Sequence, residues 1–341
     1  MSLPARASAL AHWLFLLFVC VPFAHAAAPA ASDQAAIDAL SRAAHAVVGV
    51  QVTAAEGARS AETLGRRRSG SGVVIGPEGL ILTIGYLILE ADAIQVTTHD
   101  HRVLPARAVA YDLATGFGLV RPLLPLRVAP APLGSASGTA ANTMLMAAIG
   151  GEEGGVAVTQ LVSARPFSGY WEYHIEGALF TSPPVGNHSG AGLFNQRGEL
   201  LGIGSLFVGD AAGDSQRTPG NMFVPVDLLK PVLAEMQQTG STRSSRRPWL
   251  GINSTEQGGR VQIVRVSQDS PAFAAGLLPG DVVLAIDGEK VSTLEGFYKK
   301  LWSRPEAEGE VTLTVLQGTQ VRQIPVKTVD RMKTMRQPSG I

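Results

Sequence analysis

Short apolar runs, broken by turn residues, make up most of the chain between positions 47 and 223. Val48, Val50 and Val52 alternate with Gly49 and Gln51, and this period of two is typical of a half-buried strand. Similar runs recur over 72–75, 80–82, 93–96, 107–110 and 200–207, with turns such as the one over 77–79 between them. Many short strands at such regular intervals predict a β-barrel or a β-sandwich.

Two segments on either side of this region have a helical period. Ser32 or Asp33 can cap a short helix that runs to position 44. A second helix is predicted to open at an Asp227 N-cap and to end at Gly240, with Pro231 in its first turn. Its apolar stripe consists of positions 229, 232, 233 and 236. The polar run over 241–247 then predicts a linker between two domains.

The remaining part of the chain contains clear turn and cap signals. Asp287-Gly288 lies between two apolar runs and predicts a tight hairpin, because glycine accepts the positive φ that the turn requires. Ser292 and Glu295 form a capping box, followed by apolar positions 294, 297, 301 and 302 on one helical face. A closing hairpin is expected around Gln317-Gly318, and the tail over 331–341 is expected to be disordered.

The first 26 residues have the pattern of a secretory signal peptide. Arg6 precedes a short apolar run over 13–23, and Ala24-His25-Ala26 is a small-x-small cleavage site. The run is shorter than the roughly 20 residues that span a membrane, so no membrane insertion is expected. Cys20 is the only cysteine of the chain. The mature protein is therefore predicted to be exported, periplasmic or secreted, without disulfides or a cysteine nucleophile.

Charge and composition exclude some classes of partner. The 341 residues carry zero formal net charge, and only 16% are charged, so nothing favours nucleic acid or an anionic membrane surface. His99 and His101 are spaced for a metal, but no third ligand is evident, and we expect neither a metal nor a cofactor.

A loop in the last third resembles the ligand-binding part of a PDZ domain. The stretches "WLGI" from Trp249 and "VSQDSPAFAAGLLPGDVVLAIDGEKV" carry this resemblance over residues 248–330. It implies that the N–H groups of Leu250, Gly251 and Ile252 receive a peptide carboxylate. The apolar pocket for the last side chain would be lined by Leu250, Ile252, Phe297 and Leu301. Peptides or protein C-termini are the implied partners.

The first two-thirds resemble the HtrA/Deg family of exported trypsin-fold proteases. The matching stretches are "SGSGVVIGPEGLILTIGYLILEADAIQV", "YDLATGFGLVR" and "VGNHSGAGLFNQRGELLGIGS". The resemblance implies a mainly β fold, a trypsin-like double six-stranded β-barrel followed by a small α+β PDZ domain. It also places Ser189 at the nucleophile position, Tyr86 where the family has its histidine, and Gly116 where it has the aspartate. In the oxyanion loop, Asn187 replaces a glycine, so that a Cβ enters a tight backbone approach, and His188 replaces an asparagine.

This arrangement lacks the base that a serine nucleophile needs. A serine hydroxyl attacks only when a neighbouring group takes its proton, and a phenol that titrates near 10 remains protonated at pH 7. His188, adjacent to Ser189, and His174, in an aromatic-rich loop, are alternative bases that the sequence leaves open. A turn is the expected role of Asp112.

We therefore expect an exported pseudoprotease that binds peptides through its PDZ domain as an adaptor, a regulator or a quality-control factor. The alternatives are an active serine endopeptidase with a non-standard base, and a structural scaffold with the PDZ domain as its only binding surface. The expected division is a signal peptide over 1–26, a leader and short helix over 27–44, the double barrel over 45–240, the linker over 241–247 and the PDZ domain over 248–330. The leader lacks the aromatic residues of a trimer interface, and the sequence leaves the oligomeric state open.

Overall fold

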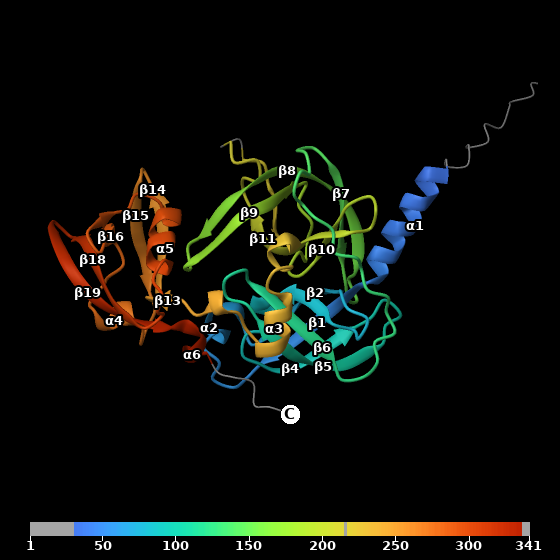
Figure 1. Cartoon of the computed structure of the whole chain (residues 1–341), viewed down its shortest axis with the longest axis horizontal. Helices are drawn as coiled ribbons and strands as arrows, with labels where there is room; N and C mark the ends of the chain where they lie inside the picture. Colours follow the sequence, from blue (N-terminus) through green and yellow to red (C-terminus); the bar gives the residue numbers. More distant parts are fainter. Residues whose placement is uncertain (1–30, 215–216, 336–341) are drawn as a thin grey trace, which may run out of the picture.

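A computed structural model describes residues 31–214 and 217–335, so the expected signal peptide lies outside the described residues (Figure 1). The first of two closed barrels consists of β1 (Val47–Ala54), β2 (Arg67–Val74), β3 (Ile81–Ile84), β4 (Ala91–Thr97), β5 (Val103–Tyr111) and β6 (Phe117–Pro122), in the order β1-β2-β3-β6-β5-β4. The alternation over 48–52 therefore marks a barrel strand, with Val50 buried and Gln51 exposed. Two short helices, α1 (Ala31–His45) and α2 (Ala61–Leu64), accompany this barrel.

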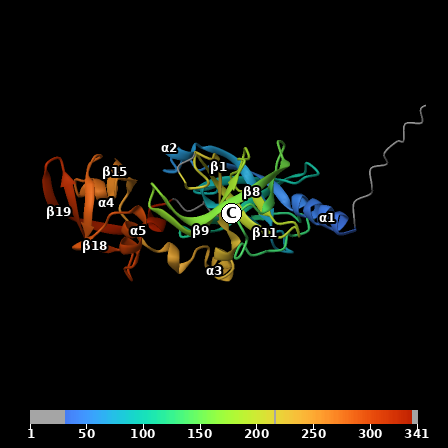
Figure 2. The ribbon, with the colours of Figure 1, turned by 90° about the horizontal axis from the view of Figure 1, so that it is seen from above.

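The second barrel closes in the order β10-β11-β12-β9-β8-β7. Its strands are β7 (Met144–Ile149), β8 (Gly155–Gly169), β9 (Tyr173–Ser182), β10 (Gly192–Phe194), β11 (Leu200–Val208) and β12 (Gly220–Pro225). β8 and β9 are the longest pair, and their hairpin reaches beyond the barrel to the C-terminal domain in both views (Figures 1 and 2). The double barrel expected from the sequence is confirmed.

The backbones of the two barrels meet at glycines. A Cβ on Gly49 of β1 would lie 2.5 Å from the Cα of Gly151, and one on Gly150 would lie 2.2 Å from the carbonyl carbon of Val48. Real Cβ atoms do not approach this closely, so only glycine permits this contact. One cluster of buried apolar side chains includes residues of both barrels, and the second barrel has a further cluster of its own.

The C-terminal domain is a sheet in the order β13-β19-β18-β16-β15-β14, with β17 paired to β16. Its strands are β13 (Pro248–Trp249), β14 (Ile252–Gln257), β15 (Arg260–Val266), β16 (Val282–Ile286), β17 (Glu289–Lys290), β18 (Gly309–Gln317) and β19 (Gln320–Asp330), and its helices are α4 (Pro271–Ala274) and α5 (Leu294–Trp302). Both predicted hairpins are present: Asp287 and Gly288 have φ of 50° and 82°, and Gln317 pairs with Gln320. β14 is the edge strand of this sheet.

Three local predictions are wrong. Asp227 does not cap the second helix, because its carboxylate accepts hydrogen bonds from the Ser135 hydroxyl and the Ala136 N–H. A 3₁₀ turn, η2 (Val226–Leu228), comes first, and α3 (Leu233–Thr239) begins only after Pro231. The cap of α5 is Thr293 rather than Ser292, and its side chain accepts the N–H of Gly296. Residues 331–334, expected to be disordered, form α6 (Arg331–Thr334), capped by the Asp330 carboxylate.

The segment expected to be a polar linker is pinned to the first barrel. It contains η3 (Arg243–Ser245), and its Thr242 and Ser245 hydroxyls donate to the buried carboxylate of Asp112. Asp112 also makes the expected turn, because its carbonyl accepts the Gly116 N–H. The Arg247 guanidinium stacks 3.6 Å from the ring centroid of Trp302 and donates to the carbonyl of Leu113. Within residues 31–214 and 217–335, no helix is long and apolar enough to cross a membrane.

Candidate functional site

Tyr86 and Ser189 come together at the junction of the two barrels. Tyr86 lies in the 3₁₀ turn η1 (Gly85–Leu87) directly after β3, and Ser189 lies in the turn before β10. The phenol oxygen of Tyr86 is 2.7 Å from Ser189 Oγ and 2.8 Å from the carbonyl oxygen of Ser205. The carbonyl can only accept. Both contacts are satisfied when the phenol donates to Ser205 and the serine hydroxyl donates to the phenol oxygen.

The environment of Tyr86 keeps its phenol neutral. Burial raises the pKa of Tyr86 to about 12, although its hydrogen bond to Ser189 opposes the rise. A phenol that holds its proton this firmly does not act as a base toward a serine hydroxyl at neutral pH. Tyr86 is therefore a hydrogen-bond partner of Ser189 whose phenol stays neutral at pH 7.

Gly116, where the resemblance predicts the carboxylate position, lies against another tyrosine. Gly116 has a φ of 80°, which disfavours any residue with a Cβ. A Cβ there would lie 2.8 Å from the phenol oxygen of Tyr173, which reaches across from β9 and donates to the carbonyl of Thr115 at 2.8 Å. Burial raises the pKa of Tyr173 well above its ordinary value, so this phenol is also neutral. An aspartate at position 116 is therefore disfavoured both by the positive φ of the backbone and by the space that the Tyr173 phenol already occupies.

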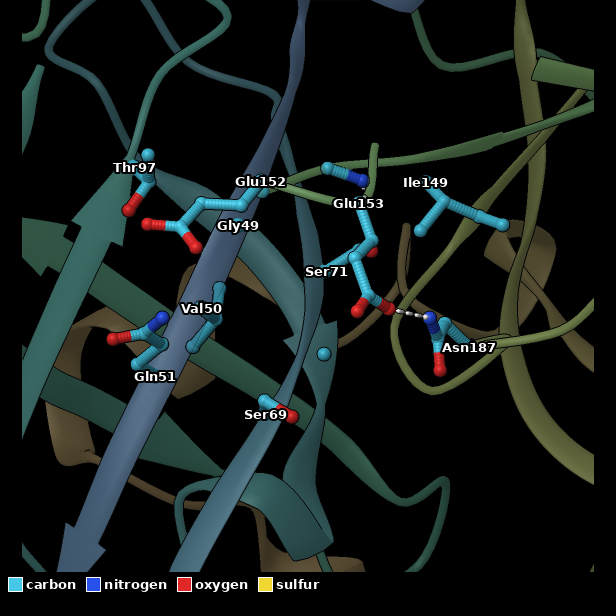
Figure 3. A pocket seen from close by; sticks show the side chains of 13 residues that line it. Gly49, Val50, Gln51, Ser69, Ser71, Thr97, Ile149, Glu152, Glu153 and Asn187 are labelled. Carbon is cyan, nitrogen blue, oxygen red and sulfur yellow. Dashed lines mark hydrogen bonds between the residues drawn. The ribbon is translucent and has the colours of Figure 1, made fainter. Parts of the chain in front are cut away.

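Asn187 keeps a glycine-like backbone in the oxyanion loop. Its φ is 48°, a region that asparagine tolerates better than most residues. The exposed side chain turns outward, and its Nδ2 donates to Glu153 Oε2 at 3.0 Å (Figure 3). His188 is half-buried, and this burial lowers its pKa, so it favours a neutral imidazole.

No imidazole of residues 31–214 and 217–335 is hydrogen-bonded to Ser189. His174 Nδ1 is 2.9 Å from the Ser168 hydroxyl, and its Nε2 is 3.2 Å from Glu176 Oε1, so both ring nitrogens are engaged. The ring of His99 packs 4.5 Å from that of His45. Within this part of the chain, the alternative bases left open by the sequence do not reach the serine hydroxyl.

A cavity of about 230 Å³ remains between the barrels beside this loop (Figure 3). Its lining from the first barrel includes Gln51 and Ser69, and from the second barrel it includes Glu152, Glu153 and Asn187. The carboxylates at its rim give it an acidic character.

The loop that was expected to receive a peptide carboxylate holds a side-chain carboxylate instead. The Leu250 N–H donates to Glu172 Oε1 at 3.0 Å, and the Gly251 N–H donates to Glu172 Oε2 at 3.2 Å. Glu172 belongs to the β8–β9 turn of the second barrel and is only 4% exposed. The adjacent backbone contact runs from the Ser254 N–H of β14 to the Tyr170 carbonyl, at 2.8 Å.

The residues expected to line the PDZ pocket are all fully covered. Leu250, Ile252, Phe297 and Leu301 belong to one apolar cluster with exposures of 0–2%. Trp249 is half-buried, and the guanidinium of Arg331 lies 5.8 Å from its ring centroid.

One group of described residues has the composition of a cation site. One ligand atom each from His174, Glu176 and Glu295 lies within 4.8 Å of the others. The Lys299 ammonium, however, is 2.6 Å from the carboxylates of both Glu176 and Glu295 and already supplies them with a cationic partner. We therefore assign no metal to this group.

Two residues that occupy the expected sites were not identified from the sequence: Tyr173, which lies against Gly116, and Glu172, which is bound by the loop over 250–251. Tyr173 and Glu172 both lie in the stretch "GYWEYHIEG". The density of aromatic residues in this stretch indicated a packed loop. No local pattern indicates that the Tyr173 phenol packs against Gly116 or that the Glu172 carboxyl group reaches the PDZ loop.

Comparisons with known proteins agree with this architecture. Residues 70–203 match the family model of trypsin-like peptidase domains, and residues 248–328 match that of PDZ domains. The chain is 27% identical over 266 residues to the serine endoprotease DegS of Haemophilus influenzae, covering 75% of this chain and 76% of DegS. It is 29% identical over 284 residues to a probable periplasmic, DegP-like serine endoprotease of Halomonas elongata, covering 78% of this chain but 57% of that relative.

Among solved structures, the HtrA-type protease AlgW with a tripeptide has the same fold. Its TM-score is 0.53 at 23% identity, and the match covers 89% of this chain and 98% of AlgW. Fold and comparisons together define a protein with a trypsin-like peptidase domain followed by a PDZ domain. The chain is homologous to the DegS and DegP serine endoproteases and shares their combination of a trypsin-like peptidase domain with a PDZ domain.

Proposed function

We propose that this protein is an exported, catalytically silent member of its family that binds peptides or protein C-termini through its PDZ domain. It would act as an adaptor, a regulator or a quality-control factor. The observation that carries this proposal is the contact between the neutral phenol of Tyr86 and the hydroxyl of Ser189. The DegP-like relatives are named as probable periplasmic proteins, which supports the proposal that this chain is exported.

The chemistry of serine proteases explains why this contact argues against catalysis. The base must take the hydroxyl proton during attack and return it to the leaving amine, and a carboxylate must stabilise the cation that forms in between. Tyr86 has no accessible cationic form near pH 7, and Gly116 provides no carboxylate. Removing the serine or the histidine of such a triad costs about a million-fold in turnover. We expect a comparable loss here.

The reactivity of the Ser189 hydroxyl can be measured on the purified chain with a serine-directed fluorophosphonate. We expect no labelling of Ser189 between pH 6 and pH 9, because the pKa of Tyr86 is about 12 and the phenol stays protonated over this range. Trypsin is the positive control, and the Ser189→Ala variant sets the background. Stoichiometric labelling that disappears in Ser189→Ala would reject the silent site.

A further inference from the structure

The turn between β8 and β9 lies in the PDZ domain where an extended peptide would bind. Three parts of the domain hold it. The edge strand β14 donates the Ser254 N–H to the Tyr170 carbonyl, and the Tyr298 hydroxyl of α5 donates to the Gly169 carbonyl at 2.8 Å. The loop before β14 donates two N–H groups to the carboxylate of Glu172. A strand edge, a facing helix and converging N–H donors are the elements by which such a groove binds a peptide that ends in a carboxylate.

The turn has a conformation that suits this position. Gly169 pairs with Tyr173, so that three residues form the loop, and the last of them, Glu172, has a φ of 57°. Three-residue hairpin loops end in this left-handed conformation, which usually selects glycine. A glutamate there costs about 1 kcal/mol or more in backbone conformation. The two hydrogen bonds of its carboxylate offset that cost.

Exposed ion pairs hold the same hairpin against α5. The Lys299 ammonium pairs with Glu176 of β9 and with Glu295 of its own helix. Pairs that remain in contact with water contribute little to binding energy. The buried contacts of Glu172 are therefore the ones whose loss should release the groove.

From these contacts we infer that the PDZ groove is closed in the resting chain by the barrel's own β8–β9 turn, with the Glu172 carboxylate in the place of a peptide's terminal carboxylate. A ligand with a free C-terminal carboxylate must displace this turn. The inference rests on the proposed function, because it assumes that the groove binds peptides. When the turn occupies the groove, the apparent affinity for a peptide equals the affinity of the open groove multiplied by the fraction of molecules whose groove is open.

Peptide binding to the full chain measures this competition. The probes are fluorescein-labelled nonapeptides ending in Ala, Val, Leu, Ile or Phe, each with a free carboxylate or as the C-terminal amide. We expect Glu172→Ala to bind the best carboxylate probe roughly ten- to a hundredfold more tightly than the wild type, because two hydrogen bonds to a buried carboxyl group are lost from the closed form. Glu176→Ala, on the same hairpin, is the matched control and should change affinity less than threefold.

Hydrogen exchange distinguishes a failure of this inference from a failure of the proposed function. Glu172→Ala should speed exchange of the Leu250 and Gly251 amides at least tenfold, whether or not any probe binds. Unchanged exchange in Glu172→Ala would overturn the closed groove, and so would equal affinities of the wild type and Glu172→Ala for a carboxylate probe that both chains bind. If exchange accelerates but no carboxylate probe binds better than its amide, peptide capture fails while the closed groove stands.

The closed state should also depend on pH. Burial, the largest influence, raises the pKa of Glu172 to about 7, whereas the N–H donors and the guanidinium groups of Arg247 and Arg331 oppose this. The Tyr298 phenol also faces the carboxyl, but burial raises its pKa, so it stays neutral. Because the closed form holds the proton more tightly than an exposed carboxyl with an ordinary pKa of 4.5, closure is strongest at low pH and weakens as pH rises through about 7.

The pH dependence of closure can be measured as the distance between two labels, one on the first barrel and one on the PDZ domain. Asp92→Cys on the first barrel and Gln323→Cys on β19 provide exposed label sites, in a Cys20→Ser background. We expect the population in which the two labels are close together to fall between pH 4.5 and pH 7.5, with the closure constant changing by roughly a hundredfold. Glu172→Gln keeps an acceptor but cannot ionise, and its distance should not change. A pH response that is the same in both chains would contradict the assignment to Glu172.

Discussion

The double variant Tyr86→His with Gly116→Asp is expected to restore no protease activity and to lower the free energy of unfolding by about 3 kcal/mol. The reason lies at position 116. An aspartate there must adopt a φ near 80°, and its Cβ must enter the space of the Tyr173 phenol. Strained backbone and overpacking each cost about 1–3 kcal/mol. The imidazole at position 86 would then lack a well-placed carboxylate.

Casein cleavage and urea unfolding together measure this outcome. Gly116→Ala is the matched control, because it introduces the same strain and the same Cβ contact without a charge. It should account for most of the lost stability. Adding Tyr173→Ala to the double variant removes the phenol that blocks the site. Cleavage by the double variant itself, abolished by Ser189→Ala, would show that only the histidine and the aspartate had been lost.

Asp112→Ala is expected to lower the free energy of unfolding by roughly 3 kcal/mol and to free the segment between the domains. The carboxylate of Asp112 is fully buried and accepts hydrogen bonds from the hydroxyls of Thr115, Thr242 and Ser245. Hydrogen bonds to a charged group contribute about 1.5–3 kcal/mol each, and the donors left behind are buried and unsatisfied.

Urea unfolding and hydrogen exchange over 242–247 check this expectation. Asp92→Ala, an exposed aspartate on β4, should be within about 0.5 kcal/mol of the wild type. A loss below about 1 kcal/mol in Asp112→Ala, with exchange over 242–247 unchanged, would mean that other contacts pin the segment.

Much of the local structure was predictable from short-range patterns. The turn at Asp287-Gly288 depends on the conformational freedom of adjacent residues, and the apolar face of α5 depends on the helical period. The cap of α5 was misplaced because the neighbouring Ser292 and Thr293 can both fill that role, and the start of α3 was misplaced because a long-range contact engages its expected cap. The Asp227 carboxylate instead accepts hydrogen bonds from Ser135 and Ala136, which are 92 and 91 positions distant in the sequence.

By itself, the sequence determined that strands dominate, that a PDZ-like loop follows, and that Ser189, Tyr86 and Gly116 occupy the positions where the resemblance predicts a catalytic triad. These properties depend on residue types and on neighbours along the chain. Only the tertiary structure decided that Tyr86 contacts Ser189, that the Tyr173 phenol lies against Gly116, and that the Glu172 carboxyl group occupies the PDZ loop. These contacts join residues at least 58 positions apart in the sequence, namely Thr115 and Tyr173, Glu172 and Leu250, and Tyr86 and Ser189. Barrel closure and domain packing bring such pairs together, and no local pattern encodes them.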